Sequence, residues 1–336
     1  MGRTIINNLV ELLELGSDVL SLGVSPSGNI HVGTLVTITN ALHYMAQNEG
    51  ALLQIAVHDL FSTFQMGLSF LPHKYKQDTY GCHATVPQHT LSEVERFIDG
   101  MSGFLGISRD RTKIRYMSDV AYTSEFRRTL NDILQDEQKR NSMRDIVKLS
   151  DADNLFVPIH PVCLGCNHSS TRYSEYTPLD STLRAVCLND QCTNEVYRTN
   201  VLDTSRELVL YYLLNLIRDV VPDNNGARAD VHFCGGDKLE VKGTEYGGKD
   251  LSILERGEQI MRLVTEDTPH IFVGALVTYR GRKLSKSQRT RFTFDALVNR
   301  YGGEWSAKIY QFTHSSISRT EYDIRGSCVS DMLRQG

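Results

Sequence analysis

The chain has 336 residues, of which 40 % are hydrophobic and 23 % charged, and its formal net charge at pH 7 is −4. These values are ordinary for a folded protein with a sizeable core, arranged as one large domain or two smaller ones. The sequence contains no apolar run of about 18 residues, so we expect no membrane-spanning helix, and its first residues lack the apolar core of a secretory signal.

The first part of the chain predicts a helix, a strand, a polar loop and a second helix. Residues 5–16 are expected to be helical and residues 18–22 to form a buried strand, which leads into Gly23-Val24-Ser25-Pro26-Ser27-Gly28-Asn29-Ile30-His31-Val32-Gly33-Thr34. Apolar residues then recur at helical spacing, namely Leu35, Ile38, Ala41, Leu42 and Met45.

The start of this second predicted helix is suited to binding phosphate. A helix N-terminus offers free backbone N–H groups and the positive end of a dipole. His31 stands at the entrance, where an imidazole can reach phosphate oxygens, and we expect the helix to open on Gly33. Because Gly33 has no Cβ, a flat ring such as adenine has room beside the backbone. The alternative is an ordinary strand-to-helix turn that happens to contain a histidine.

Two further strands complete half of an α/β sheet. Residues 51–59 are predicted to form a buried strand, residues 90–107 a helix and residues 112–117 a third strand. This alternation predicts the first half of a doubly wound fold with a parallel sheet. Ligands of such sheets bind at the carboxyl ends of the strands, so Ser25 and Asp59 are candidate substrate contacts. Alternatively, Asp59 caps the turn that follows its strand.

A cysteine-rich segment follows the charged, helical residues 120–150, after a change of composition at Pro158. It holds a C-x2-C pair and, twenty residues later, a C-x4-C pair, formed by Cys163, Cys166, Cys187 and Cys192. Four thiolates on two short turns are what tetrahedral zinc requires, and a closed site of this kind is structural. Gly165 is expected to make the first turn tight, and His168 is a further candidate ligand. The odd total of seven cysteines favours a reducing compartment, the cytoplasm.

The second half of the sheet is predicted after this segment. Residues 203–221 carry a helical pattern, and residues 230–234 form a predicted strand that ends in Gly235-Gly236-Asp237. The two glycines allow a substrate to approach the backbone closely, and Asp237 places a carboxylate at the end of the strand.

A basic loop rich in hydroxyl groups follows the last predicted strand. Residues 251–264 are predicted to form a helix and residues 270–276 a strand, before Lys283-Leu284-Ser285-Lys286-Ser287 and the helical residues 294–310. Residues 277–336 hold eleven Lys and Arg against five Asp and Glu. This excess suits contact with phosphates, or it is a solvated basic surface.

Together, the two loops resemble the paired signatures of class I aminoacyl-tRNA synthetases. Ser27-Gly28-Asn29-Ile30-His31-Val32-Gly33-Thr34 is similar to the "HIGH" segment, although many members carry a second histidine where Thr34 stands. Lys283-Leu284-Ser285-Lys286-Ser287 is similar to "KMSKS" with one conservative change. The order and the separation of the two segments fit that family.

The resemblance implies activation of an amino acid by ATP, with Mg²⁺ as the expected companion of the nucleotide. It implies that His31 stabilises the phosphates and that Lys286 closes over them, assisted by Lys283. Gly33 would carry the adenine and Asp237 would bind the ribose. The remaining nucleotide contacts would come from Ser27, Gly28, Asn29, Thr34, Gly235, Gly236, Ser285 and Ser287.

The resemblance also divides the chain. Residues 1–119 and 229–292 would be the halves of a Rossmann-like catalytic domain, residues 120–228 a connective insert with the zinc knuckles, and residues 293–336 a short helical C-terminal segment. Archaeal-type class I lysyl-tRNA synthetases look most similar, partly through Gly248-Lys249-Asp250. This resemblance favours lysine as the substrate and the acceptor end of tRNA as the partner. Glutamyl, arginyl and cysteinyl specificities remain open.

Only 49 residues follow Ser287. We expect this stretch to be too short for a sizeable anticodon-binding domain. One alternative is therefore a stand-alone paralogue that transfers the amino acid to another acceptor. Another is a module that binds nucleotide or tRNA without catalysis, and a third is a nucleotidylyltransferase that shares the first loop. We expect no membrane partner, and the sequence carries no indication of oligomeric state.

Overall fold

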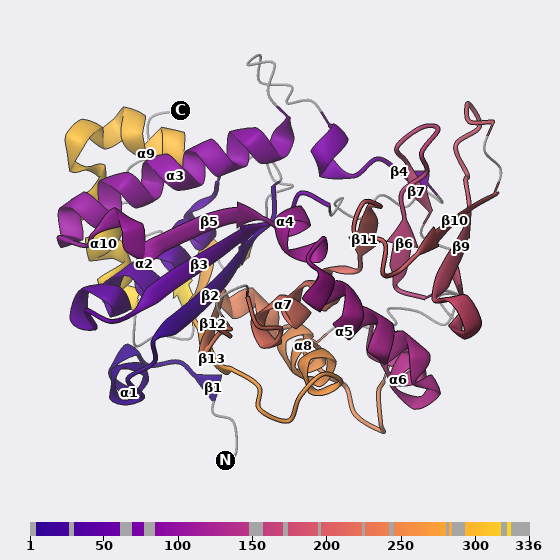
Figure 1. The fold of residues 1–336 in the computed structure, drawn as a ribbon. Helices are drawn as coiled ribbons and strands as arrows, with labels where there is room; N and C mark the ends of the chain where they lie inside the picture. The colour runs from indigo at the N-terminus through magenta and orange to yellow at the C-terminus, as the bar shows by residue number, and fades with distance from the viewer. Residues whose placement is uncertain are drawn as a thin grey trace.

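The computed structural model contains a six-stranded parallel sheet with helices on both faces (Figure 1). The structure describes residues 5–26, 30–60, 69–76, 85–147, 157–170, 174–193, 196–223, 226–241, 245–279, 282–283, 293–316 and 321–323. No helix in these ranges is long and apolar enough to cross a membrane.

The central sheet has the strand order β1-β13-β12-β2-β3-β5, and every neighbouring pair is parallel. Its members are β1 (Ile5–Ile6), β2 (Val19–Val24), β3 (Leu52–Val57), β5 (Thr112–Tyr116), β12 (Val231–Cys234) and β13 (His270–Val273). The helices that alternate with these strands confirm the predicted doubly wound α/β class.

The N-terminal edge strand differs from the prediction of one helix over residues 5–16. Ile5 and Ile6 pair with β13, and helix α1 covers only Leu9–Glu14. The Asn8 side chain accepts the Val10 N–H at 3.0 Å and so starts the helix after the strand. Ile5 and Ile6 form a strand because they pair with β13, which is remote in the sequence. Local periodicity cannot indicate such a partner.

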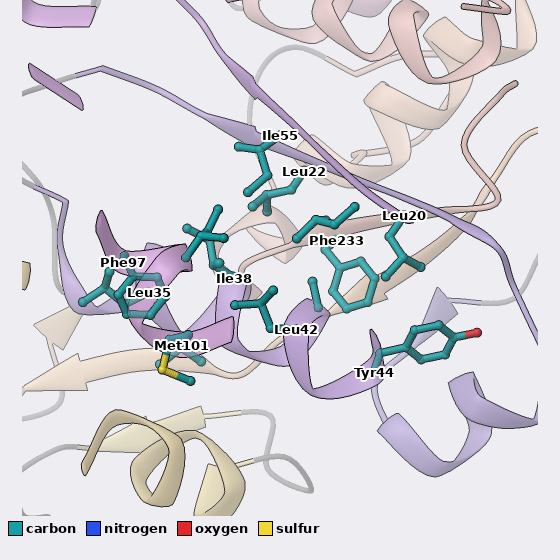
Figure 2. Packing of buried hydrophobic residues seen from close by; sticks show 14 of the residues in the cluster. Leu20, Leu22, Leu35, Ile38, Leu42, Tyr44, Ile55, Phe97, Met101 and Phe233 are labelled. Carbon is teal, nitrogen blue, oxygen red and sulfur yellow. The ribbon is translucent and has the colours of Figure 1, made fainter. Parts of the chain in front are cut away.

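Helices α2 (Val32–Gln47) and α3 (Val86–Leu105) cover one face of the sheet, together with α9 (Phe294–Tyr301) and α10 (Trp305–Ser316). Figure 2 shows this core, in which α2 and α3 lie against the strands through Leu35, Ile38, Leu42, Phe97, Met101, Leu20, Leu22, Ile55 and Phe233. Helix α3 begins earlier than predicted because Thr85 and Gln88 form a reciprocal capping box.

The other face of the sheet has its own apolar contacts. Helices α7 (Ile217–Val220) and α8 (Ile253–Arg262) pack there on β12 and β13 through Val220, Leu254, Met261, Cys234, Ile271 and Val273. A separate core, formed outside the six central strands, is built from α4 (Met117–Ala121), α5 (Ser124–Gln135) and α6 (Glu137–Val147) with further residues of α7 and α8.

The predicted helix over 203–221 is wrong for most of its length. Leu208–Leu210 form strand β11, which pairs antiparallel with β6 (Ile159–Pro161), and a 3₁₀ turn at Tyr212–Leu216 precedes α7. The residues of β11 are buried, but their backbone bonds go to β6 and not along a helix.

The remaining strands form small sheets. The cysteine-rich part contains the antiparallel sheet β10-β9-β8, and a short pair, β4-β7, joins it to the segment after β3. The predicted strand over 270–276 ends at Val273, and a new strand forms a hairpin that pairs with a C-terminal strand. The bounds are β4 (Ser69–Phe70), β7 (Ser169–Ser170), β8 (Ser174–Thr177), β9 (Thr182–Val186), β10 (Val196–Asn200), β14 (Leu276–Tyr279), β15 (Arg282–Lys283) and β16 (Glu321–Asp323). Further 3₁₀ turns lie at His73–Tyr75, Arg109–Arg111, Pro178–Asp180, Gly236–Leu239 and Gly302–Glu304.

The contact between α3 and α10 gives a test of the fold. Trp305 packs between Phe97 and Phe294, with ring centroids 5.2 and 5.0 Å away. A Cβ on Gly100 would lie 2.3 Å from Trp305 Cζ2, whereas a Cβ on Gly103 would meet no atom within 4 Å. We expect Gly100→Ala to lower the free energy of unfolding by about 1–3 kcal/mol. Gly103→Ala should raise it by about 0.5–1 kcal/mol. Urea unfolding measures both, and equal effects would contradict this packing.

Candidate active site

The parallel arrangement brings several predicted site residues to one edge of the sheet, where the strands end. Ser25 follows β2, Asp59 follows β3 and Gly235-Gly236-Asp237 follow β12, while His31 is the N-cap of α2. Six predicted residues lie outside the described ranges, namely Ser27, Gly28, Asn29, Ser285, Lys286 and Ser287.

His31 has a defined orientation at the start of α2. Its Nδ1 accepts the backbone N–H of Gly33 at 3.0 Å. Since a backbone amide can only donate, Nδ1 must be unprotonated, and the neutral ring carries its proton on Nε2. The helix begins at Val32, one residue before the predicted opening. The imidazole can therefore donate a hydrogen bond at the helix N-terminus, where anions are favoured.

Gly33 has a role in the structure that the sequence did not indicate. A Cβ there would lie 2.9 Å from Cε1 and 3.1 Å from Nδ1 of His31. The missing side chain thus allows the imidazole to fold over the first turn of the helix. The Gly33 carbonyl accepts from the Thr37 hydroxyl at 3.0 Å, and the Thr34 N–H donates to the His31 carbonyl at 3.0 Å. Room for adenine beside Gly33 stays a prediction.

Glu93 is a site residue that sequence reasoning missed. It lies in the middle of α3, is 1 % exposed, and accepts the backbone N–H of Ile30 on Oε2 at 2.8 Å. His89, one turn earlier, lies 3.8 Å from the same oxygen. The buried carboxylate therefore fixes the residue before His31. An acidic residue on the apolar face of a predicted helix was the available signal.

The chain after the second signature contacts the first. Lys283, the first residue of the second signature, ends β15, and its backbone pairs with Thr278 of β14. Thr293, six residues after Ser287, forms an antiparallel bridge with His31, and the Phe294 N–H donates to the Ile30 carbonyl at 2.9 Å. The start of α9 is thus in direct backbone contact with the first signature.

The glycines after β12 allow close backbone packing. A Cβ on Gly236 would lie 2.5 Å from Leu276 N and 2.8 Å from the Gly274 carbonyl oxygen. The end of β12 therefore lies against the chain that enters the β14–β15 hairpin. Next to it, Asp237 is half-buried and its Oδ2 lies 3.2 Å from Lys238 Nζ.

Asp59 has a structural partner at the end of β3. The carboxyl is 3 % exposed and its Oδ1 accepts the Ser118 N–H, in the first turn of α4, at 2.9 Å. Burial raises the pKa of this carboxyl, against the effect of the Ser118 hydrogen bonds and of Lys74. The capping alternative is therefore observed, although the turn belongs to α4 and not to the residues directly after Asp59. Substrate contact by Asp59 or Ser25 stays a prediction.

A polar cluster next to Asp59 links it to the cysteine-rich part. The Lys74 N–H donates to the Asp59 carbonyl at 2.8 Å, and its ammonium lies 2.5 Å from Glu207 Oε1. The Tyr75 hydroxyl donates to the other oxygen of Glu207. Lys74 also lies over the Tyr122 ring, 5.6 Å from its centroid. These contacts come from four separated segments, so no local pattern in the sequence indicated them.

The four predicted zinc ligands come together. Their sulfur atoms all lie within 4.8 Å of one another, with Cys163 and Cys192 Sγ 3.6 Å apart and Cys166 and Cys187 Sγ 3.5 Å apart. These separations are too long for disulfides. A tetrahedron of sulfurs about 2.3 Å from a central ion has edges of about 3.8 Å, so the set fits one metal ion.

The first cysteine pair lies on a tight turn that includes Gly165, as expected. The Asn167 N–H closes the turn on the Cys163 carbonyl at 2.8 Å, and Asn167 has the left-handed φ of 59°. His168 is outside the cluster, because its Nδ1 contacts the Cys166 carbonyl at 2.9 Å. Burial opposes ionisation of Cys166, but hydrogen bonds from the His168 amide and from neighbouring side chains lower its pKa to about 6. Burial and the neighbouring thiols raise the pKa of Cys163 and Cys187, so the four thiols do not ionise equally easily.

Comparisons with known proteins give structural similarity alone. No protein-family model and no curated protein matches the sequence. A tryptophanyl-tRNA synthetase from Campylobacter jejuni is 14 % identical over 90 % of this chain and 67 % of its own, with a TM-score of 0.35. A protein from the same species, assigned as an arginyl-tRNA synthetase, is 11 % identical over 99 % and 73 %, also with a TM-score of 0.35. At these values neither likeness decides the family or the activity of the chain.

Proposed function

We propose that this chain activates an amino acid with ATP, forming an aminoacyl-adenylate and releasing pyrophosphate, and then transfers the amino acid to tRNA. The observation that carries the proposal is the bridge between His31 and Thr293. It brings Thr293, six residues after the basic loop, to the histidine at the start of α2, which supports the proposal that two segments about 250 residues apart in the chain act on one nucleotide.

The proposed chemistry depends on positioning and on charge stabilisation. His31 donates from Nε2 to a phosphate oxygen as negative charge develops, and the α2 N-terminus adds its dipole. Lys286, assisted by Lys283, closes over the β- and γ-phosphates, while Ser285 and Ser287 donate hydrogen bonds. Asp237 binds the ribose hydroxyls. Mg²⁺ accompanies ATP and contacts mainly the phosphates.

The proposal also names the amino acid that is activated and the acceptor that receives it. The sequence resemblance favours lysine, with glutamate, arginine and cysteine as alternatives, and it favours the acceptor end of tRNA. A stand-alone paralogue with a different acceptor would still form the adenylate. A module without catalysis would bind ATP or tRNA and release no pyrophosphate, so the exchange reaction separates these two alternatives.

We also propose that Cys163, Cys166, Cys187 and Cys192 hold a structural Zn²⁺. The four sulfurs already surround one point at suitable separations, and soft thiolates are preferred ligands of zinc. With four protein ligands the ion has no open position for a substrate. It would instead connect the two cysteine turns next to the three-stranded sheet β10-β9-β8.

His31→Asn tests the proposed activity. Asparagine preserves a side-chain acceptor for the N-terminus of α2, so we expect an unchanged melting temperature. It removes the imidazole donor, so ATP–pyrophosphate exchange should fall about 100- to 1000-fold. Lys286→Ala should have a comparable effect. His314→Ala, a histidine on the exposed side of α10, is the matched control and should keep full exchange.

The exchange assay is run with each of the twenty amino acids. Exchange that His31→Asn leaves intact would contradict the role of His31. If the folded protein binds ATP but shows no exchange with any amino acid, with or without tRNA, the proposal of adenylate formation is wrong and the binding module is favoured.

Metal analysis tests the zinc proposal. We expect one zinc per chain, and Cys187→Ser should lose the ion and lower the melting temperature. Cys234→Ser, which removes a thiol on β12 outside the cluster, should keep it. A metal-free protein with an unchanged melting temperature would show that the four cysteines do not need an ion.

A further inference from the structure

The face of the central sheet that is turned towards α7 carries polar side chains, among them Ser21 of β2 and His232 of β12. Side chains alternate between the two faces of a strand, so Ser21 and Gly23 lie opposite the leucines of β2 that pack beneath α2. Ser21 pairs in register with His232 of β12. Gly23 pairs in register with Ala56 of β3, and Ala56 pairs with Arg115 of β5.

Asp219 of α7 organises the inner part of this polar face. Its Oδ1 accepts from the Ser21 hydroxyl at 2.5 Å and lies 3.2 Å from Arg218 Nε, and its Oδ2 lies 2.8 Å from His232 Nδ1. Burial opposes ionisation of this carboxyl, but Arg218, His232 and Ser21 lower its pKa to about 2. Asp219 is thus an anion paired within the protein, and it holds Arg218 in place.

The outer end of the Arg218 guanidinium faces the end of β2. Its Nη1 lies 2.8 Å from His58 Nε2. Its Nη2 is buried and has no acceptor among the residues that the structure describes. A Cβ on Gly23 would lie 3.2 Å from Nη2 and 2.8 Å from His58 Nε2. A buried donor without a partner is costly, so a ligand acceptor at this place would stabilise Arg218.

Further donors lie around the same place. Arg115 is half-buried and donates to Gln54 Oε1 at 2.9 Å. Burial and then the neighbouring Arg218 lower the pKa of Arg115, while Asp223, Asp219 and Asp119 act in the opposite sense. Asn215, one turn before Arg218, is 4 % exposed, and its Nδ2 has no acceptor in the described part of the chain. The place is rich in donors that can meet an anion.

We propose that Arg218 and Arg115, beside Gly23, bind the side-chain carboxylate of the substrate, so that the amino acid activated here is glutamate or aspartate. This inference rests on the proposed function and names its substrate class. A lysine ammonium would instead be repelled by two guanidinium groups. The carboxylate of Asp219 could not compensate, because it is already paired with Arg218 and His232.

The position of Gly23 fits one amino acid bound across the strand end. Gly23 is close to the end of β2. Arg218 lies beside it on one face of the sheet, and α2 covers the other face. The α-carboxylate that reacts with ATP must face the α2 side, where His31 lies. The side chain of the same molecule then extends towards Nη2 of Arg218, beside the His58 imidazole that occupies the space next to Gly23.

The test measures binding and exchange separately. Calorimetry without ATP is run with glutamate, aspartate, glutamine, lysine and inorganic phosphate on the full chain. We expect saturable binding of glutamate or aspartate, and Arg115→Met should raise its Kd about 10- to 100-fold. Lys113→Met, two residues earlier on the same strand and exposed, is the matched control and should change the Kd less than twofold, a change of about 0.4 kcal/mol. In exchange, Arg115→Met should raise the KM for the acidic amino acid and not for ATP.

Each outcome decides between the proposals. Binding and exchange with lysine or a neutral amino acid, and not with an acidic one, overturn this inference and leave the proposed function standing. Binding of glutamate or aspartate that depends on Arg115, without any exchange, supports the anion site and overturns adenylate formation. If the protein binds phosphate alone and Arg115→Met weakens that binding, the guanidinium groups of Arg218 and Arg115 bind phosphate and the inference is overturned. A failure to bind any of these ligands also overturns it.

Discussion

The backbone of Ile30 is the point on which the candidate active site depends. Its N–H is held by Glu93 of α3 and its carbonyl by the Phe294 N–H at the start of α9. Glu93 is nearly fully buried, and a buried carboxylate is tolerated where hydrogen bonds compensate it. Because both bonds come from remote segments, the position of the next residue, His31, is set by the tertiary structure. The contact with Phe294 also joins the start of α9 to the start of α2.

The two faces of the sheet differ in polarity. Towards α2 and α3 the strands present apolar side chains that form a continuous core (Figure 2). Towards α7, Ser21 of β2 and His232 of β12 contact Asp219 of that helix, which forms a buried ion pair with Arg218. Burial of such charges without good geometry would destabilise the fold. The compensation within this group leaves one donor-rich place at Gly23, beside the edge where ligands of α/β sheets bind.

The cysteine-rich part has a different physical basis. Its sheet β10-β9-β8 has only three short strands, and small sheets gain limited stability from their own apolar face. It is joined to the segment that follows β3 by the β4–β7 pair and by the contacts of Glu207 with Lys74 and Tyr75. A cluster of four thiols on two of its turns supplies the chemistry for a cross-link by metal. The part can therefore be held in a defined position beside Asp59.

The sequence by itself determined the α/β class, five of the six central strands, the helix that follows His31 and the grouping of the four cysteines. These features follow from local periodicity, from glycine and from ligand spacing, all of which act over a few residues. Only the tertiary structure decided that Ile5–Ile6 and Leu208–Leu210 are strands, that Glu93 anchors Ile30, and that Arg218 faces Gly23. In each case the partner lies far away along the chain, and pairing or burial against it outweighs local propensity. A linear pattern records which residues are apolar or charged, but not which remote group each of them meets.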